Sequence, residues 1–566
     1  MRKIIYLIPF LPILVWLPLL LVATMPSGHD LYAHLTYAKL FEKALGEGQF
    51  PVRWMEWIKP GFSQPLFNFY QVGFYYLVSL VSWLPVSFLM SAKLAILFLW
   101  WLGTFFTFLF ARRFGVIPAT IACIIYAFSP YLILDIFVRN AFPEFMAISL
   151  MPAVFWAADR LISTARAIFI IPFALFLGTS AFSHLPATLI FLPVLVLYSL
   201  MLMQGQNRLK RKLVFLGLAS VLAFGLAAFY LMPAVIELNL VQINKIKVDN
   251  FDFHRHFVNA GQSFLSSLGD TKHYTNFHFQ LQSIQAISVL VLVAGSFFVI
   301  RKKMNQFLLF WMGMLIYAWF FSGYDSLVVW EKVKFLGFIQ FPWRFLMVTP
   351  LALAVLAAYF CQRIKSSNFR LITLPAAILL GVFSVMFYLK PVKFTDVAYF
   401  NLPFAQWAAF PKTQQRAFLE PAYYPKEVKT IPNEDMPLLN PQTGVEVNEK
   451  KISSGHLILE VSSPKPASLV VNTHYFPGWT AYINGKTVQV NPTDANFIGI
   501  SVPAGGSLVE VKFADTKLRM WANIISLASL VILILVIWLE KLFVRRSYFL
   551  KLLYNIPARF QFPDIH

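Results

Sequence analysis

Charge and cysteine are scarce in this chain of 566 residues. Only 13% of the residues are charged, and the two cysteines, Cys123 and Cys361, both lie within apolar runs. Such cysteines are typical of small buried hydrophobes, so a disulfide framework and a cysteine-ligated zinc site are excluded. The sequence also lacks a glycine-rich phosphate loop, a zincin motif, a nucleophile elbow, internal repeats and low-complexity tracts. These absences exclude a soluble nucleotide-binding domain and argue against a nucleotide cofactor.

Apolar residues are abundant instead. Hydrophobic residues make up 58% of the chain and aromatic residues 17%, and the mean hydropathy is +0.65. This composition is typical of a multi-pass membrane protein whose core is a bilayer-embedded bundle. The formal net charge of +21 comes from basic clusters between the apolar runs, a pattern that encodes orientation rather than nucleic-acid binding. We therefore expect the clusters, and both termini, on the cytoplasmic side of the cell membrane.

The hydropathy predicts a polytopic α-helical membrane protein with about 12–14 transmembrane helices. The expected crossings, each near the ~20 residues that a bilayer needs, are 4–24, 92–111, 116–134, 143–161, 167–182, 186–204, 212–234, 283–300, 305–322, 341–362, 370–388 and 521–540. The first is predicted to be retained rather than cleaved. Residues 66–84 are also apolar, but a simple crossing there would place every later basic cluster on the opposite, non-cytoplasmic side of the membrane. We expect this segment to be re-entrant, interfacial or paired with another partial crossing.

A less apolar stretch follows the crossings. From 390 to 519, short alternating runs such as HLILEV, KTVQV and GSLVEVKF are separated by turn signals, which predicts a β-sandwich-like domain near the C-terminus. Asn484-Gly485 is a strong hairpin signal within it. We thus expect three parts: a transmembrane domain at 1–389 with a first outer loop at 26–91, an extracytoplasmic β-rich domain at 390–519, and a final helix with a basic cytoplasmic tail at 520–566.

The stretch 26–70 combines charges with aromatic residues, as in the headgroup layer of a membrane. Apolar residues recur at helical spacing from Leu31 to Leu45, and Gly46 and Gly48 then end the pattern. Asp30 and His34 lie one turn apart at its start, which places a carboxylate and an imidazole on one side of the helix. Asp30 is therefore a candidate catalytic group, and the alternative is that it only caps the helix.

Several strings of this sequence resemble known families. GHDLYAHLTYAKLFEKALGEGQFPVRW, GFSQPLFNFY, FVRNAFPEF, FYLMPAVIE, IQFPWRF and HYFPGWTAYINGK resemble the bacterial membrane families called YfhO-like and 6-pyruvoyl-tetrahydropterin-synthase-related, of the GT-C superfamily of polytopic glycosyltransferases. The second name implies no pterin chemistry here. The resemblance implies a GT-C-like fold and a transferase that moves a sugar from a polyprenyl-phosphate carrier to an acceptor on the outer face.

The same resemblance implies an acidic catalytic or metal-associated residue soon after the first span, and the matching position is Asp30. His29 stands where a second adjacent acid is expected. His29, Asp30 and His34 together form a weak divalent-metal candidate, since no fourth ligand lies at recognisable spacing. Whether a metal binds is unknown from the sequence.

The chemistry of sugar transfer points to the same outer segments. A carboxylate at Asp30, with His34, can act as base on the acceptor. Arginine matches the geometry of a leaving phosphate. The candidate substrate-binding residues at the outer ends of the spans and in the first outer loop are His29, Glu56, Arg139, Glu144, His184, Glu237 and Arg344. The alternatives are a structural Arg139–Glu144 ion pair, snorkelling of Arg344 and local structural roles for Glu56, His184 and Glu237.

Three functions remain in competition. The leading prediction is an inverting membrane glycosyltransferase with a polyprenyl-phosphate sugar donor and an envelope glycan or lipid as acceptor. Trp54, Trp57 and Trp479 are candidates for stacking on sugar faces. A transporter or flippase of lipid-linked envelope precursors is the first alternative. A non-catalytic envelope scaffold is the second, and it would not depend on Asp30.

Overall fold

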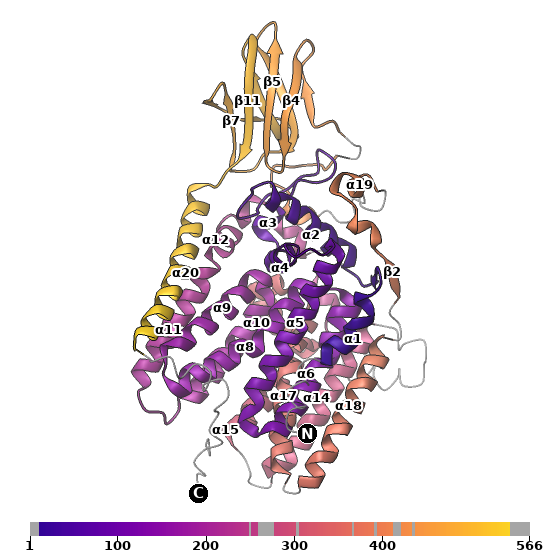
Figure 1. Ribbon diagram of the computed structural model, residues 1–566, viewed down its shortest axis with the longest axis vertical. Coiled ribbons are helices and arrows are strands. Elements are labelled where there is room, and N and C mark those ends of the chain that lie inside the picture. Colours follow the sequence, from indigo (N-terminus) through magenta and orange to yellow (C-terminus); the bar gives the residue numbers. More distant parts are fainter. Residues whose placement is uncertain are drawn as a thin grey trace.

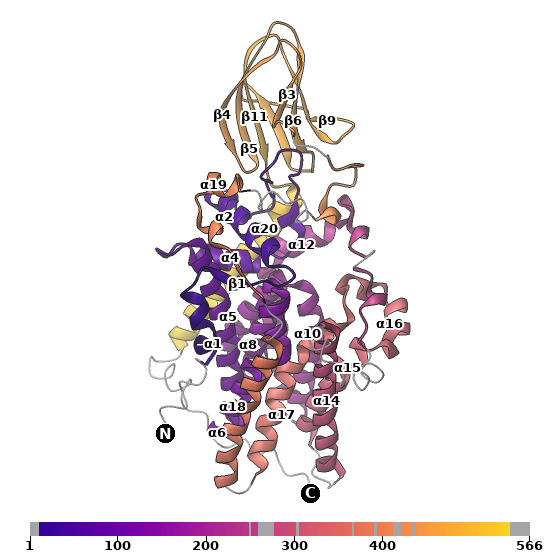
Figure 2. The same ribbon diagram turned by 90° about the vertical axis from the view of Figure 1, so that its right-hand side faces the viewer.

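The structure, a computed structural model, describes residues 11–247, 251–258, 277–300, 305–364, 367–389, 393–410, 420–432 and 436–543. Long helices run side by side in one bundle, and a β domain stands at one end of it (Figures 1 and 2). The helix α20 (Lys517–Phe543) descends from the β domain along α11 (Leu209–Leu226) and α12 (Ala228–Ile236). The last helix therefore ties the β domain to the bundle.

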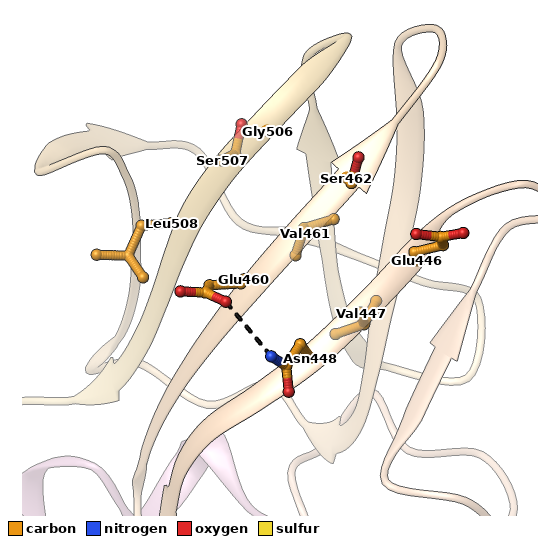
Figure 3. A pocket seen from close by; sticks show the side chains of 9 residues that line it. All are labelled: Glu446, Val447, Asn448, Glu460, Val461, Ser462, Gly506, Ser507 and Leu508. Atoms are coloured by element: carbon orange, nitrogen blue, oxygen red, sulfur yellow. Dashed lines mark hydrogen bonds between the residues drawn. The ribbon is translucent and has the colours of Figure 1, made fainter.

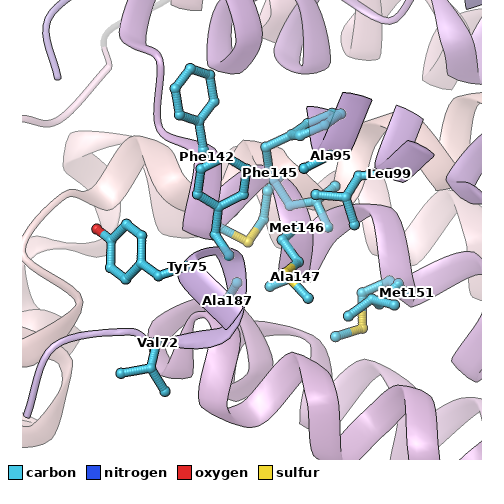
Figure 4. Close-up of a cluster of buried hydrophobic side chains, with 14 of the residues drawn as sticks. Val72, Tyr75, Ala95, Leu99, Phe142, Phe145, Met146, Ala147, Met151 and Ala187 are labelled. Carbon is cyan, nitrogen blue, oxygen red and sulfur yellow. The ribbon is translucent and has the colours of Figure 1, made fainter. Parts of the chain in front are cut away.

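The bundle helices are apolar on all sides, as expected for segments surrounded by lipid and by one another. The remaining long helices are α1 (Leu11–Leu20), α5 (Phe88–Ala111), α6 (Val116–Ala127), α8 (Phe142–Thr164), α9 (Ile170–Ser183), α10 (Leu185–Met203), α14 (Phe277–Ile300), α15 (Gln306–Ser322), α17 (Thr349–Arg363) and α18 (Ser367–Leu389). The helix α8 lies at the centre, where Phe142, Phe145, Met146 and Met151 pack among side chains of the first loop, α5 and α10 (Figure 4). This core supports the end of the bundle nearest the β domain.

Six helical segments in the described part of the chain are long and apolar enough to cross a membrane. Two bent pairs raise the number to eight if each is one span: α11 with α12, bent by 70°, and α15 with the segment Tyr324–Lys332, bent by 80°. The helices α9, α14 and α18 also coincide with predicted crossings. The predicted fold class, a polytopic α-helical membrane protein with a β-rich region near the C-terminus, is confirmed.

The first loop folds into three short helices, α2 (Leu31–Gly46), α3 (Leu66–Phe69) and α4 (Gly73–Val81). The helix α2 begins after Asp30 and ends at Gly46, as the periodicity predicts. Gly48 then adopts φ +93°, which favours glycine. With nine residues, α4 is only ~14 Å long, too short to cross a bilayer.

The β domain contains two antiparallel sheets. One has the order β3-β6-β10-β9 and the other β4-β5-β11-β7-β8. Their strands are β3 (Leu439–Pro441), β4 (Glu446–Ser453), β5 (His456–Ser463), β6 (Ala467–His474), β7 (Trp479–Ile483), β8 (Lys486–Val488), β9 (Asn491–Pro492), β10 (Phe497–Val502) and β11 (Gly505–Phe513). Alternate residues of β5, β6 and β11 are buried in one apolar core, as in a sandwich. Asn484 and Gly485, with φ of 50° and 78°, form the predicted hairpin turn between β7 and β8.

The β domain packs directly on the first loop. The ring centroids of Trp54 and Trp479 lie 5.2 Å apart. Arg53 forms an ion pair of 2.8 Å with Asp515, two residues before α20 begins. A two-stranded ladder also joins β1 (Thr24–Pro26) to β2 (Phe394–Asp396). The first loop is thus held between the bundle and the β domain.

Candidate functional site

Asp30 occupies the N-cap position of α2, but its side chain makes no capping hydrogen bond, and the residue is exposed. The chain that leads to it is fixed by backbone contacts instead. The N–H of Asp30 donates to the carbonyl oxygen of Arg139 at 2.9 Å, and the N–H of His29 donates to that of Val138 at 3.1 Å. The backbone at Asp30 is therefore fixed, and the Asp30 carboxylate makes no capping hydrogen bond to α2.

A left-handed residue completes this support. Asn140 has φ 56° and follows η3 (Leu134–Arg139), a π-helix, a feature that is frequent at functional sites. The side chain of Asn140 accepts a hydrogen bond of 2.6 Å from the N–H of Gly28 and donates one of 2.6 Å to the carbonyl oxygen of Ile136. A Cβ atom on Gly28 would lie 2.2 Å from Asn140 Oδ1 and 2.6 Å from the carbonyl oxygen of Val138. Only glycine fits there.

Directly beneath the Asp30 backbone lies a buried ion network centred on Glu144. Its Oε1 accepts from Arg139 Nη1 at 2.8 Å and from the Tyr131 hydroxyl at 2.6 Å, and its Oε2 accepts from Arg139 Nη2 at 3.0 Å. Arg344 Nε donates to the same Oε2 at 3.0 Å. Arg139 also pairs with Asp135. Glu144 thus joins the segment that carries Tyr131 and Arg139 to the distant segment that carries Arg344.

His184 and Arg344 border this network. His184 Nδ1 accepts the N–H of Ala187 at 3.0 Å, so the ring carries its proton on Nε2, which lies 3.7 Å from Glu144 Oε2. Arg344 Nη1 donates to the carbonyl oxygen of Ile339 at 2.7 Å and to Gln340 Oε1 at 3.1 Å. Both residues are therefore anchored where they lie.

The network brings together four of the predicted site residues, Arg139, Glu144, His184 and Arg344. Its two arginines are matched by two carboxylates, those of Asp135 and Glu144. This arrangement is the structural ion pair that the sequence left as an alternative for Arg139 and Glu144. It offers no surplus of positive charge for a phosphate at Arg139.

His34 lies one turn along α2 from Asp30, and its N–H donates to the Asp30 carbonyl oxygen at 3.0 Å. The ring is buried, and Nδ1 lies 2.8 Å from the Tyr75 hydroxyl. Burial lowers the pKa of His34 to about 4, against the opposing charge of Asp30. His34 is thus a neutral side chain at pH 7. Burial also lowers the pKa of His29.

A second carboxylate, which the sequence analysis missed, faces the same helix. Glu420 hydrogen bonds to the Tyr37 side chain on α2, and the Asp30 charge reaches it. Desolvation and the Asp30 charge raise the pKa of Glu420 to about 7. In the sequence, the only signal for Glu420 was its position between aromatic residues in FLEPAYYP. Its relation to Asp30 could not be predicted, because 390 residues separate the two.

Two predicted site residues lie in other clusters. Glu56 accepts from Ser63 Oγ at 2.9 Å and from Trp54 Nε1 at 3.1 Å, under the β domain. Burial raises the pKa of Glu56. Glu237 pairs with Arg519 at 3.0 Å and accepts from Asn68 at 2.8 Å. Both clusters join the first loop to neighbouring segments.

The three tryptophans considered for sugar stacking, Trp54, Trp57 and Trp479, are all buried. Trp54 of the first loop packs against Trp479 of β7, where the first loop contacts the β domain.

No group of three or more His, Cys, Asp or Glu side chains able to hold an ion occurs in the part of the chain that the structure describes. The carboxylates of Asp30 and Glu420 therefore have no third ligand of these types within those residues.

Two hollows lie away from Asp30. One, of about 700 Å³, spreads over β4, β5 and β11, where Glu460 accepts a hydrogen bond from Asn448 (Figure 3). The other, of about 320 Å³, is an apolar groove lined by Leu189, Ile190, Pro193, Tyr317, Phe321, Val329, Val333, Phe335, Leu336, Ile339 and Phe345. Its lining residues Ile339 and Phe345 flank the segment that carries Arg344.

Comparison with solved structures finds a similarity to "Arabinofuranosyltransferase AftD from Mycobacteria", with 15% sequence identity and a TM-score of 0.42. The match covers 69% of this chain and 26% of that one, so the chain spans about a quarter of the length of that protein. No curated protein sequence matches the chain. The family model described as "Bacterial membrane protein YfhO" matches residues 441–526, which contain β4 to β11 and the start of α20, and confirms the resemblance to YfhO over this part of the chain.

Proposed function

We propose that the protein is a membrane glycosyltransferase that takes a sugar from a polyprenyl-phosphate donor and attaches it to an envelope glycan or lipid. In this proposal the β domain and the Asp30 loop lie on the outer face of the cell membrane, and both termini lie in the cytoplasm. The resemblance to YfhO-like proteins over 441–526 supports the proposal.

One observation carries it: the exposed Asp30 carboxylate makes no capping hydrogen bond, although the backbone around it is fixed. A carboxylate that only capped the start of the helix would accept hydrogen bonds from the first N–H groups of that helix. A catalytic base needs the opposite, a positioned oxygen that is open to the substrate.

The reaction is a single displacement. Asp30 takes the proton of an acceptor hydroxyl as its oxygen forms a bond to the anomeric carbon of the donor sugar. The bond from that carbon to the phosphate oxygen breaks, and its electron pair leaves with the polyprenyl phosphate. This step inverts the anomeric centre and needs no covalent enzyme intermediate. Neutral His34 fixes the start of α2 through Tyr75.

The apolar groove supports a place for the lipid donor. Arg344 bonds to the carbonyl oxygen of Ile339, and Ile339 lines the groove. A prenyl chain in the groove would bring its phosphate to the Arg344 segment. The Arg344 bonds to protein use Nε and Nη1, and we assign the leaving phosphate to Nη2, where arginine matches its geometry.

A flippase for the same lipid-linked sugars is the second candidate. The two bent helix pairs favour it, because broken helices are typical of transporters. The ion network around Glu144 adjoins Asp30 through the Arg139 main chain, and the loop of Asp30 packs on the β domain through Trp54, which supports the transferase.

The test uses the purified protein in liposomes with radiolabelled polyprenyl-phosphate sugars and extracted envelope acceptors. We expect transfer by the wild type and a loss of at least about 100-fold in Asp30→Asn, with Asp325→Asn, at an exposed position, as the matched control. Equal activity in Asp30→Asn would remove Asp30 from the site. Movement of the lipid across the bilayer without transfer would favour the flippase.

A further inference from the structure

The segment that carries Glu420 is held by hydrogen bonds to the first loop and to the segment that follows α12. The Tyr424 hydroxyl donates to the carbonyl oxygen of Phe62 at 2.9 Å. Gln242 Nε2 donates to the carbonyl oxygens of Pro425 and Val428 at 3.1 and 2.7 Å. Glu420 therefore has a defined position at the start of this segment.

Aromatic rings connect Glu420 to the face of α2 that carries His34. The Glu420 carbonyl oxygen accepts a hydrogen bond from the N–H of Tyr423. The ring centroids of Tyr423 and Tyr70 lie 6.0 Å apart. Tyr70 in turn meets Tyr37 at 5.6 Å and His34 at 6.3 Å. Since residues 30, 34 and 37 follow one another at helical spacing, Asp30 and Glu420 lie along the same face of α2.

Within the part of the chain that the structure describes, Glu420 is linked to a tyrosine and to a second acid of the first loop. Tyr37 hydrogen bonds to it, and the charged group that acts on it is Asp30, which is itself negative. The side chain is partly exposed. Glu144 and Glu237, by contrast, pair with the arginines Arg344 and Arg519 and are buried.

We propose that Glu420 is a further catalytic residue, which binds the hydroxyl groups of the acceptor next to the one that Asp30 deprotonates. This inference rests on the proposed function. A carboxylate accepts two hydrogen bonds from neighbouring hydroxyls, so it selects a sugar or polyol acceptor over a simple alcohol. Glu420 thereby orients the attacking oxygen, while Asp30 takes its proton.

The experiment measures transfer by Glu420→Gln at varied acceptor concentration and, separately, at varied donor concentration. We expect the KM for the envelope acceptor to rise about 10- to 100-fold, as for a lost hydrogen bond to a charged group. The donor KM should stay within about twofold. Glu420→Asp keeps the charge and should restore part of the affinity. Glu427→Gln, at an exposed position of the same segment, should behave as the wild type.

A second variant guards against misfolding. Tyr37→Phe removes the hydroxyl that bonds to Glu420 and should raise the acceptor KM by about 3- to 10-fold. An unchanged acceptor KM in Glu420→Gln, with Asp30→Asn inactive, would overturn the Glu420 assignment and leave the proposed function standing. Equal loss for donor and acceptor with a lower melting temperature would show a structural role and would also overturn it. Absence of transfer by the wild type would overturn the proposed function and this assignment together.

Discussion

Arg139 supports Asp30 through its main chain and not through its side chain. The Arg139 carbonyl oxygen accepts the Asp30 N–H at 2.9 Å, whereas its guanidinium turns to Asp135 and Glu144. The guanidinium also lies over the Trp343 ring, with its Cζ 4.3 Å from the ring centroid. The ion network is therefore the foundation of the Asp30 loop, and the Arg139 guanidinium is already paired with two carboxylates of the protein.

We expect Glu144→Gln to destabilise the protein strongly. The change removes the anionic partner of two buried arginines, Arg139 and Arg344. Removal of one partner of a buried ion pair costs about 3–5 kcal/mol. Thermal unfolding in detergent or nanodiscs would show a lowered melting temperature.

The control for this change is Glu331→Gln, at an exposed position, which should leave the melting temperature unchanged. Addition of Arg344→Met to Glu144→Gln should recover part of the loss, because one uncompensated charge disappears. A melting temperature equal to that of the wild type in Glu144→Gln would contradict the network's structural role.

Gly28→Ala should impair transfer more than stability alone explains. The new Cβ atom would lie 2.2 Å from Asn140 Oδ1 and 2.6 Å from the carbonyl oxygen of Val138, so the chain before Asp30 must shift. A shift of about 1 Å can cost about 100-fold in rate.

Gly46→Ala is the matched control, because nothing lies within 4 Å of a Cβ atom there. It ends the same helix and should be neutral or stabilising by up to about 1 kcal/mol. Full activity in Gly28→Ala would mean that the loop tolerates the displacement and that its fixed position is not needed.

Local patterns in the sequence predicted local structure well. The helix from Leu31 to Gly46 and the hairpin at Asn484 and Gly485 depend on neighbours a few residues apart, and both were predicted. The membrane-protein class followed equally from hydropathy. These features are fixed by propensity and burial, which short windows of sequence report.

Long-range pairing was beyond the sequence. The sequence offered an Arg139–Glu144 ion pair as an alternative, but nothing in the spacing showed that Glu144 also neutralises Arg344. Glu420 was missed because its relation to Asp30 depends on packing between the first loop and a segment 390 residues later. Whether any of these residues takes part in catalysis stays a prediction.

The stability of the protein should depend on pH through Glu420. Among the described residues, the titratable groups that act on it are those of Asp30, Tyr37, Tyr70, Tyr75 and Tyr423. Its pKa is raised from 4.5 to about 7 in the folded protein, so the folded state holds a proton that the unfolded chain has lost. The stability that this proton contributes is complete below pH 4.5 and is lost as the pH rises through 7.

Glu420→Gln should therefore become more stable relative to the wild type between pH 5 and pH 8. Melting temperatures of both proteins across this range measure the difference, with Glu427→Gln as control. A constant difference between Glu420→Gln and the wild type would contradict the raised pKa. A stability difference that shrank as the pH rose would have the wrong sign. It would exclude a Glu420 pKa that is raised by burial and by the Asp30 charge.

The last prediction concerns the apolar groove, where a larger side chain should block binding of the lipid donor. Val329 lines the groove, whereas the adjacent Val328 is exposed and does not. Both belong to α16 (Leu327–Lys332). Val329→Trp would add a large side chain to a space of about 320 Å³, and we expect the KM for the polyprenyl-phosphate sugar to rise about tenfold or more, which corresponds to at least about 1.4 kcal/mol of lost binding.

Val328→Trp adds the same side chain outside the groove and should leave the donor KM near the wild-type value. Because the groove takes the chain and not the acceptor, the acceptor KM should be unaffected in both variants. A short-chain donor should also lose less affinity than a long-chain donor in Val329→Trp, since it fills less of the groove. Equal donor KM values in the two variants would place the prenyl chain elsewhere on the bundle and would remove the reason for assigning the phosphate to Arg344.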